Sequence, residues 1–408
     1  MRYDILYVIR PAAGGMREHV FHLARGMASK GYRVAIVGPQ DVYSGETIMA
    51  RELEAAGVDL ILLPLVGSLS PLHDAAACAR LMKIIVGARP EIVHTHGFKA
   101  SLVGRLAVAA SKPFFRSRLL LKLPFRSRLY HESVPGCVCT VHNSIVGQYG
   151  AHSAAYCIVK LSERTLAPFS DATIVVSEAL KREYEELSAG RCRAVRFIPN
   201  GIDLARFSPR RNDVWTPGQF RIGTVARLIP QKGVGTLIRA FPAIKELYPS
   251  AELLIVGDGV ERPALEGLCG ELRLKDSVRF LGYREDVPEI LRELDVFVLA
   301  SESEGGMSLS IIEAMASRIP VIATHIGGIP EIVQDRITGI LIPPGDPVAL
   351  AEAVKWVFSN PEEVSKLVSK AYDTVKERFS ATAMVDEVHK VYEMVWVRAG
   401  ERETEIHG

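Results

Sequence analysis

The chain of 408 residues lacks any apolar run of the about 18 residues or more that a membrane-spanning helix takes. Its N-terminal segment has only five apolar residues in a row, Ile5 to Ile9, behind the acidic Asp4. A secretory signal core takes about 7–15 such residues. We therefore expect a cytoplasmic protein that at most lies as a peripheral protein on the inner face of a membrane.

Paired cysteines are missing as well. The six cysteines contain no C-x2-C pair, and no histidines accompany them at a spacing typical of zinc sites. Buried, reduced thiols fit this pattern, and we expect no metal ion. They stand at positions 78, 137, 139, 157, 192 and 269.

Neither familiar nucleotide-binding glycine motif is complete. Gly14-Gly15 and Gly257-Asp258-Gly259 both fail G-x-G-x-x-G, because positions 18 and 262 are Glu and Arg, and there is no G-x4-G-K-[ST] loop. Glycines after a strand still let an anion approach the amides at a helix N-terminus. Gly14 and Gly15 are candidates for this contact, and a tight turn without ligand is the alternative.

The residues that are abundant indicate an α/β protein. The composition is 48% hydrophobic, enough to bury large cores in two domains. Short apolar runs alternate with helical patterns along the whole chain, which is typical of parallel βαβ units. Strands are expected to include Ile5 to Ile9, Arg33 to Val37, Asp59 to Leu63, Ile92 to Thr95, Cys137 to Val141, Thr173 to Val176, Val195 to Ile198, Leu253 to Val256, Val278 to Leu281, Val296 to Leu299 and Val321 to Ala323.

Charge is distributed unevenly along the chain. Residues 1–210 hold 27 Lys and Arg against 17 Asp and Glu, which leaves 22 against 30 of the chain totals of 49 and 47 for the rest. A basic first half can face an anionic surface or acceptor. Complementary charge between two halves that touch is the alternative explanation.

Two cations and two carboxylates stand where apolar runs end. Arg227 and Lys232 follow the run that ends at Ala226, and Glu304 and Glu313 follow the run that ends at Ala300. Cations can neutralise a diphosphate that gains charge as it leaves, and carboxylates can accept hydrogen bonds from sugar hydroxyls. The set therefore suits a nucleotide sugar.

Together these residues resemble retaining glycosyltransferase family 4. The resemblance spans nearly the whole chain and is most specific in the second half. It implies the GT-B architecture of two Rossmann-like doubly wound domains with a donor cleft between them. We place the N-terminal acceptor-side domain at 1–205, the nucleotide-sugar domain at 206–380 and a helix crossing back to the first domain at 381–408. The resemblance rests on Gly14-Gly15, Pro199-Asn-Gly-Ile-Asp203, Arg227 with Lys232, Gly257-Asp-Gly259, Phe280-Leu-Gly282, Ser301 with Glu304, Glu313-Ala-Met-Ala316, Pro320-Val-Ile-Ala323, Gly327-Gly-Ile-Pro-Glu331 and Thr338-Gly339.

The resemblance also implies roles for single residues. Arg227 and Lys232 bind the diphosphate and stabilise it as it departs, and Glu304 lies beside the transferred sugar. The remaining donor-binding positions are Gly14, Gly15 and Gly257, Glu313 on the ribose, and the amides near Ser308 and Leu309. Eight residues separate Glu304 from Glu313, where the family has seven, so we expect a local bulge at the glycines after Glu304 to absorb the extra one.

Histidines cluster at two predicted strand ends. His142 resembles the family histidine near the donor sugar and is assigned a catalytic role. His94 and His96 should face the same side of their strand, which suits a zinc pair only weakly because no third ligand is evident. Packing or acceptor contact fits them better, and His19 is expected to lie on the surface.

The predicted function is retaining transfer of a sugar from a nucleoside-diphosphate sugar, with a UDP-sugar as co-substrate and no cofactor, to a hydroxyl acceptor that is a lipid-linked or envelope glycan. No nucleic acid partner is expected. A nucleotide-sugar epimerase and a non-catalytic nucleotide-sugar-binding protein remain alternatives. The segment 112–129 carries six basic residues and no acid, so it can dock on an anionic membrane. A basic loop without a membrane role is the alternative.

Overall fold

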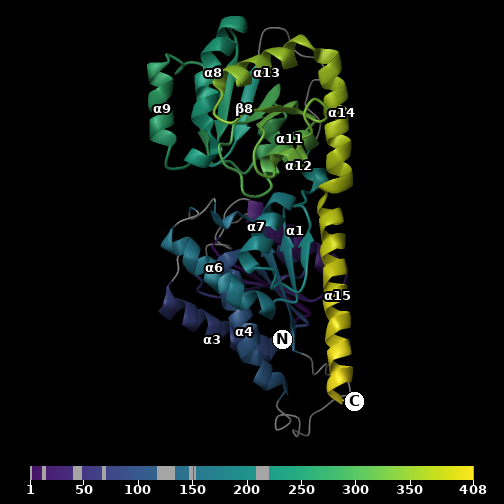
Figure 1. Ribbon diagram of the computed structural model, residues 1–408. Helices are drawn as coiled ribbons and strands as arrows, with labels where there is room; N and C mark the ends of the chain where they lie inside the picture. The colour runs from purple at the N-terminus through teal and green to yellow at the C-terminus, as the bar shows by residue number, and fades with distance from the viewer. Residues whose placement is uncertain are drawn as a thin grey trace. The chain divides into compact units, whose positions relative to one another are not determined.

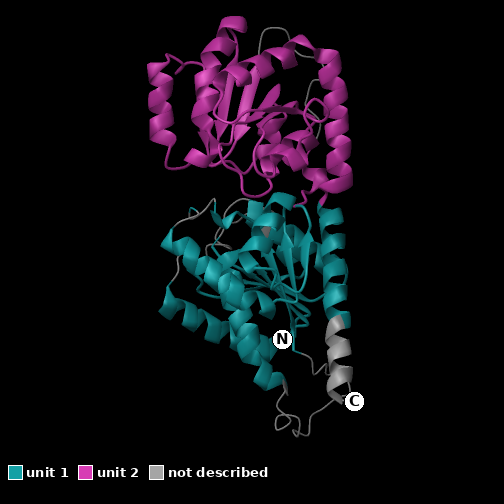
Figure 2. Ribbon diagram, viewed as in Figure 1, with its two compact units in different colours: residues 1–199, 381–408 teal, residues 200–380 magenta. Residues whose placement is uncertain are grey.

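The computed structural model describes residues 2–11, 15–39, 48–66, 70–116, 134–146, 150, 153–207 and 220–407. Gly14, most of the basic segment 112–129 and the expected interdomain linker at 208–218 lie outside these residues. The chain divides into two compact units, one of residues 1–199 with 381–408 and one of residues 200–380 (Figure 2). The division falls between Pro199 and Asn200, a few residues before the boundary expected at 205.

The first unit is built on a parallel sheet of seven strands in the order β3-β2-β1-β4-β5-β6-β7. Its strands are β1 (Ile5–Ile9), β2 (Val34–Gly38), β3 (Asp59–Leu62), β4 (Ile92–His96), β5 (Gly136–Val141), β6 (Ala172–Val175) and β7 (Val195–Phe197). Its helices are α1 (Gly15–Ser29), α2 (Ile48–Ala55), α3 (Pro71–Ala88), α4 (Phe98–Arg116), α6 (Ala154–Leu166), the short η3 (Ala167–Phe169), α7 (Glu178–Ser188) and α15 (Ala381–His407).

Alternation along the central strands divides the core of this unit into two layers. Ile5 and Tyr7 of β1 pack with α1 and α15, whereas Leu6 and Val8 pack on the opposite face with α3 and α4 (Figure 1). Strands covered on both faces are apolar at nearly every position, which is why they read as continuous runs in the sequence. The predicted apolar stripe of the last helix is confirmed, since its four residues lie in the first of these layers: Val385, Val388, Tyr392 and Val395.

The second unit is built on a parallel sheet of six strands in the order β10-β9-β8-β11-β12-β13. Its strands are β8 (Arg221–Val225), β9 (Glu252–Val256), β10 (Val278–Gly282), β11 (Val296–Leu299), β12 (Val321–Thr324) and β13 (Ile340–Ile342). Its helical segments are η4 (Leu204–Arg206), η5 (Pro230–Lys232), α8 (Val234–Leu247), α9 (Arg262–Glu271), α10 (Val287–Leu291), α11 (Leu309–Ala316), α12 (Ile329–Ile332), α13 (Pro347–Ser359) and α14 (Pro361–Arg378).

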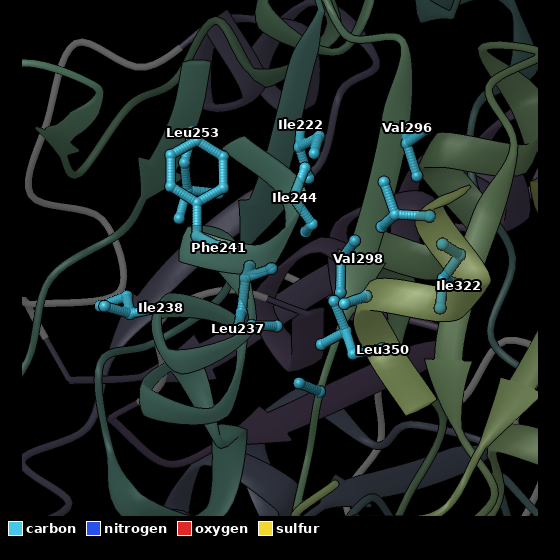
Figure 3. Packing of buried hydrophobic residues seen from close by; sticks show 14 of the residues in the cluster. Ile222, Leu237, Ile238, Phe241, Ile244, Leu253, Val296, Val298, Ile322 and Leu350 are labelled. Atoms are coloured by element: carbon cyan, nitrogen blue, oxygen red, sulfur yellow. The ribbon is translucent and has the colours of Figure 1, made fainter. Parts of the chain in front are cut away.

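One face of this second sheet carries a continuous apolar core. Leu237 and Phe241 of α8 and Leu350 of α13 pack against Ile222 and Val298 of the central strands (Figure 3). The two doubly wound sheets confirm the predicted α/β class. Strand β13 was not predicted, although β7, which also has three residues, was.

Candidate functional site

The sheet of the second unit reverses its winding direction between β8 and β11. From β8 the chain proceeds outward to β9 and β10, and from β11 outward to β12 and β13. Ligands of open α/β sheets bind outside the carboxyl ends of the strands at such a switch point. Arg227 and Lys232 follow β8 and Glu304 follows β11, so the fold brings these three predicted residues to the switch point.

Arg227 is held on a loop that two glycines allow to pack closely. Leu228 exchanges backbone hydrogen bonds with Asp258 and Glu261, at 2.9 and 3.0 Å. A Cβ on Gly257 would collide with the carbonyl of Ala226, and Gly257 has a φ of 123°, which side chains rarely adopt. The Arg227 side chain itself is exposed and has no ion-pair partner among the described residues. It is therefore an exposed cation, on a backbone held in place, that is available to an anion.

Lys232 is paired with Glu304. Its Nζ donates to Glu304 Oε2 at 2.5 Å, and the side chains are 16% and 12% exposed. Ser301 Oγ donates to the same carboxylate oxygen at 3.3 Å. A charge-assisted contact at such low exposure is stronger than a surface ion pair. The structure thus joins the predicted diphosphate cation to the predicted sugar carboxylate, a contact that the sequence did not predict.

The loop after β11 positions the Glu304 carboxylate despite the extra residue in its spacing. Glu302 N donates to Gln231 O at 2.9 Å, which ties the loop to η5. Thr324 Oγ1 donates to Ser301 O at 2.7 Å. Gly327, with a φ of 56°, lies so close to the Glu304 carbonyl that an added Cβ would collide with it. These contacts hold the backbone so that the carboxylate faces Lys232.

Helix α11 begins beside this loop. Ser308 is its N-cap residue and is buried, as is Leu309 at the first helical position. The exposed N–H groups of a helix start suit an anion. Glu313 is partly buried one turn further on, so the structure places the predicted donor residues of this helix along one short segment.

The first unit has its own switch point between β1 and β4. Gly15 is the first residue of α1, directly after the β1 connection, and His96 is the last residue of β4. His142 follows the end of β5, the next strand. The predicted donor-binding residue Gly15 and the predicted catalytic residue His142 therefore both lie at the switch point of the first unit, and Gly14 lies outside the described residues.

Three histidines meet at this position. His96 Nδ1 and His142 Nε2 are 3.2 Å apart, and the His19 ring lies 4.8 Å from the His142 ring, centroid to centroid. All three are buried. Two expectations are wrong: His19 is 1% exposed rather than a surface residue, and a third nitrogen ligand does lie near His96. Both errors have one cause. The burial of His19 is decided by neighbours that are distant in the sequence, and the helix pattern does not reveal them.

Two histidines of this cluster, His96 and His142, are held in their neutral form. Burial lowers the pKa of His142, and the neighbouring histidines and Arg10 lower it further by repulsion of positive charge. Burial and the adjacent His94 lower the pKa of His96 in the same way. Neutral imidazoles offer one donor and one acceptor nitrogen each, so the cluster can accept hydrogen bonds or coordinate a metal near neutral pH.

His94 links the cluster to the last helix. Its Nδ1 bonds with Tyr392 Oη at 2.6 Å and its Nε2 with Thr140 Oγ1 at 2.7 Å. Tyr392 in turn donates to Tyr7 Oη at 3.1 Å. As predicted, His94 and His96 lie on the same side, with ring centroids 4.2 Å apart. His94 therefore has a packing role, and its ring holds the neighbouring His96 ring in place.

Two family models match the chain, one in each half. Residues 14–201 match a model described as a glycosyl transferase 4-like domain, and residues 219–360 match one described as glycosyl transferases group 1. No helix in the described residues is both long and apolar enough to cross a membrane.

The chain is similar along most of its length to named proteins and to a solved structure. The glycogen synthase of Mycobacterium tuberculosis is 26% identical over 415 residues, covering 96% of this chain and 93% of that protein. The Escherichia coli UDP-Gal:alpha-D-GlcNAc-diphosphoundecaprenol alpha-1,3-galactosyltransferase is 28% identical over 341 residues, covering 80% and 81%. The crystal structure of Anabaena HepE with UDP and glucose has a TM-score of 0.75 at 20% identity and covers 96% of this chain and 100% of that one. The predicted GT-B fold is confirmed.

Proposed function

We propose that this chain, which belongs to the group 1 glycosyltransferases, transfers a hexose from a nucleotide sugar, namely a UDP-sugar, with retention at the anomeric carbon. Its N-terminal domain is of the glycosyltransferase 4-like type. The observation that carries the proposal is the arrangement of Arg227, Lys232 and Glu304 at the switch point of the second unit. Arg227 is an exposed cation without a counter-ion among the described residues, and Lys232 bonds to the little-exposed carboxylate of Glu304. UDP is the nucleotide bound to the similar HepE.

The Lys232–Glu304 contact implies an order of events, in which Lys232 binds the diphosphate first and Glu304 then binds the sugar. An incoming diphosphate competes with Glu304 for the ammonium group, since both are anions that bind Lys232 by charge-assisted hydrogen bonds. Once Lys232 turns to the phosphate, the Glu304 carboxylate is available to accept from hydroxyls of the sugar. Donor binding thereby exchanges one ion pair for another and exposes the group that recognises the sugar.

The transfer step follows from this arrangement. The bond from the anomeric carbon to the phosphate oxygen breaks, and the acceptor oxygen forms its bond on the same face. The acceptor proton passes to the leaving phosphate. Arg227 and Lys232 stabilise the charge that grows on the diphosphate, so catalysis is mainly positioning and electrostatics. His142, neutral near pH 7 because burial lowers its pKa, is assigned to a hydroxyl of the transferred sugar.

A lipid-linked or envelope acceptor is supported by the surface of the first unit. Helices α4 and α6 pack together and expose large apolar side chains beside cations. Lys112 lies 5.6 Å from the ring centroid of the exposed Phe169. The similar E. coli enzyme is named for a diphosphoundecaprenol substrate. An anionic membrane attracts such a surface through its cations while the apolar groups insert. The exposed apolar residues are Leu106, Phe114, Ile158, Leu161 and Phe169.

Hydrolysis of donors without acceptor tests the core of the proposal. The protein is incubated with UDP-, GDP- and ADP-sugars. Nucleoside diphosphate and free sugar are followed by mass spectrometry, and the configuration of the released sugar and of the remaining donor is followed by proton NMR. Release of UDP with an α-configured sugar from an α-linked donor is expected. An epimerised nucleotide sugar would show that the protein is an epimerase rather than a transferase. Binding without any turnover, with or without acceptors, would indicate a binding protein.

The acceptor is tested separately with vesicles. Binding to anionic vesicles that weakens at high salt is expected, because the cations are screened. Replacement of Leu161 and Phe169 by Ser removes exposed apolar groups and should reduce binding further. Failure to bind anionic vesicles at low salt would overturn the membrane acceptor and leave the transfer reaction standing.

A further inference from the structure

The three histidines of the first unit come from three elements that meet at its switch point. His19 lies on α1, His96 ends β4 and His142 follows β5. Each offers one ring nitrogen, and the three nitrogens lie within 4.8 Å of one another. We propose that this unit binds one divalent ion of the zinc type through His19, His96 and His142.

The spacing of the ligand atoms fits such an ion. Two nitrogens bound to one tetrahedral zinc at about 2.0–2.1 Å lie about 3.3 Å from each other. His96 Nδ1 and His142 Nε2 are already 3.2 Å apart. Only the His19 ring has to move closer, and its centroid lies 4.8 Å from that of His142 and 5.5 Å from that of His96. Three imidazoles with one open position form a known zinc donor set.

His96 is held in place for this task. Its ring is fully buried, stacked between His94 at 4.2 Å and His142 at 5.5 Å. A ring fixed in advance loses little freedom on binding the ion, which favours affinity.

The donor atoms decide which ion fits. Each neutral imidazole has one nitrogen without a proton, and this nitrogen is the one able to coordinate. Imidazoles suit Zn²⁺, Co²⁺, Ni²⁺ and Cu²⁺, whereas Mg²⁺ and Ca²⁺ prefer oxygen. The fourth position of a three-histidine site of this kind is open to water or another ligand.

Metal binding has a consequence that rests on the proposed function. A bound ion occupies a ring nitrogen of His142, which is assigned to the sugar during transfer. Zinc should then inhibit the enzyme, and a chelator should restore its activity. The ion is thus a reversible inhibitor at this position.

The experiment measures binding directly, without donor or acceptor. The full-length protein is stripped with a chelator and titrated with Co²⁺, whose visible absorption reports four-coordinate nitrogen ligation, and with Zn²⁺ in a calorimeter. One ion per chain is expected, with no response to Mg²⁺. Zn²⁺ should also raise the thermal midpoint, because it binds only the folded state. The replacements His19→Gln, His96→Gln and His142→Gln should each weaken binding at least about a hundredfold, since loss of a supporting outer-shell partner alone costs about 10–100-fold.

His22→Gln is the matched control, because His22 is buried on the same helix as His19 but lies outside the trio. It should bind as the wild type does. Circular dichroism of each metal-free variant shows whether it is folded. Folded variants of the trio that bind zinc like the wild type, or a wild type that binds no stoichiometric ion, would overturn the site. Zinc that binds without slowing transfer would overturn the role of His142 and leave the metal site intact.

Discussion

The two units share one strand order, extended by a seventh strand in the first unit, but they have different chemistry at their switch points. In the second unit the residues are charged: Arg227 is exposed and Lys232 pairs with Glu304. In the first they are histidines buried and kept neutral by their surroundings, His96 and His142 among them. Charge suits the anchoring of a diphosphate, and neutral imidazoles suit hydroxyl groups or a metal ion. The fold therefore fixes where a site lies, and the side chains at the strand ends fix what it binds.

Removal of Glu304 should have the largest effect. The Glu304→Ala variant should lose transfer, because no carboxylate remains for the sugar hydroxyls. Its affinity for UDP should rise, because Lys232 no longer has a competing partner. Turnover assays and calorimetry with UDP measure the two effects. Deletion of Gly305, which restores the family spacing, should preserve or raise activity.

Glu302→Ala is the control for Glu304, since Glu302 is exposed on the same loop. If the two alanine variants show the same turnover, the role of Glu304 in the charged site is wrong. If UDP affinity is unchanged in Glu304→Ala, the competition for Lys232 is wrong.

A buried charge in the first unit should matter for stability rather than chemistry. Arg105 is 1% exposed and donates to Glu163 at 2.7 Å and to Ser170 at 2.8 Å. Glu163→Ala leaves the guanidinium buried without its carboxylate, which should lower the free energy of unfolding by about 3–5 kcal/mol. Denaturant unfolding of the first unit measures this. Arg164→Ala, on the same helix and exposed, should change it by less than about 0.5 kcal/mol.

Loss of a cation from the second unit should reduce turnover without unfolding it. Arg227→Ala and Lys232→Ala should each lower turnover at least about a hundredfold, or about 2.7 kcal/mol in the barrier. Steady-state kinetics and a thermal melt provide the two measurements. Near-wild-type turnover in either variant would remove that residue from the diphosphate site. Arg239→Ala is a control, since Arg239 is exposed on α8 in the same unit.

The smallest effect should come from the link between the histidines and the last helix. Tyr392→Phe removes the hydroxyl between His94 and Tyr7, and an unsatisfied buried nitrogen costs about 1–3 kcal/mol. The free energy of unfolding should fall by that amount while zinc binding persists. An unchanged stability would show that His94 finds another partner.

Sequence patterns predicted the strands that alternate or are buried on both faces, and they placed Arg227, Lys232 and Glu304 at strand ends. They did not predict the contact between Lys232 and Glu304, because it joins two loops 72 positions apart through adjacent strands. They also missed the burial of His19, because a helix pattern shows which residues share a face but not which elements pack against that face. Strand β13 was missed, although its length is that of β7, which was predicted.

The position of α15 has a consequence for how the protein is made. Val388, Tyr392 and Val395 share a core with Ile5 and Tyr7, so this core is complete only after α15 has been synthesised. The second unit, from Asn200 to Ser380, is continuous in the chain and can fold while α15 is still inside the ribosome. Loop closure over such a span is slow compared with local contacts. Folding during synthesis should therefore complete the first unit only after α15 has left the ribosome.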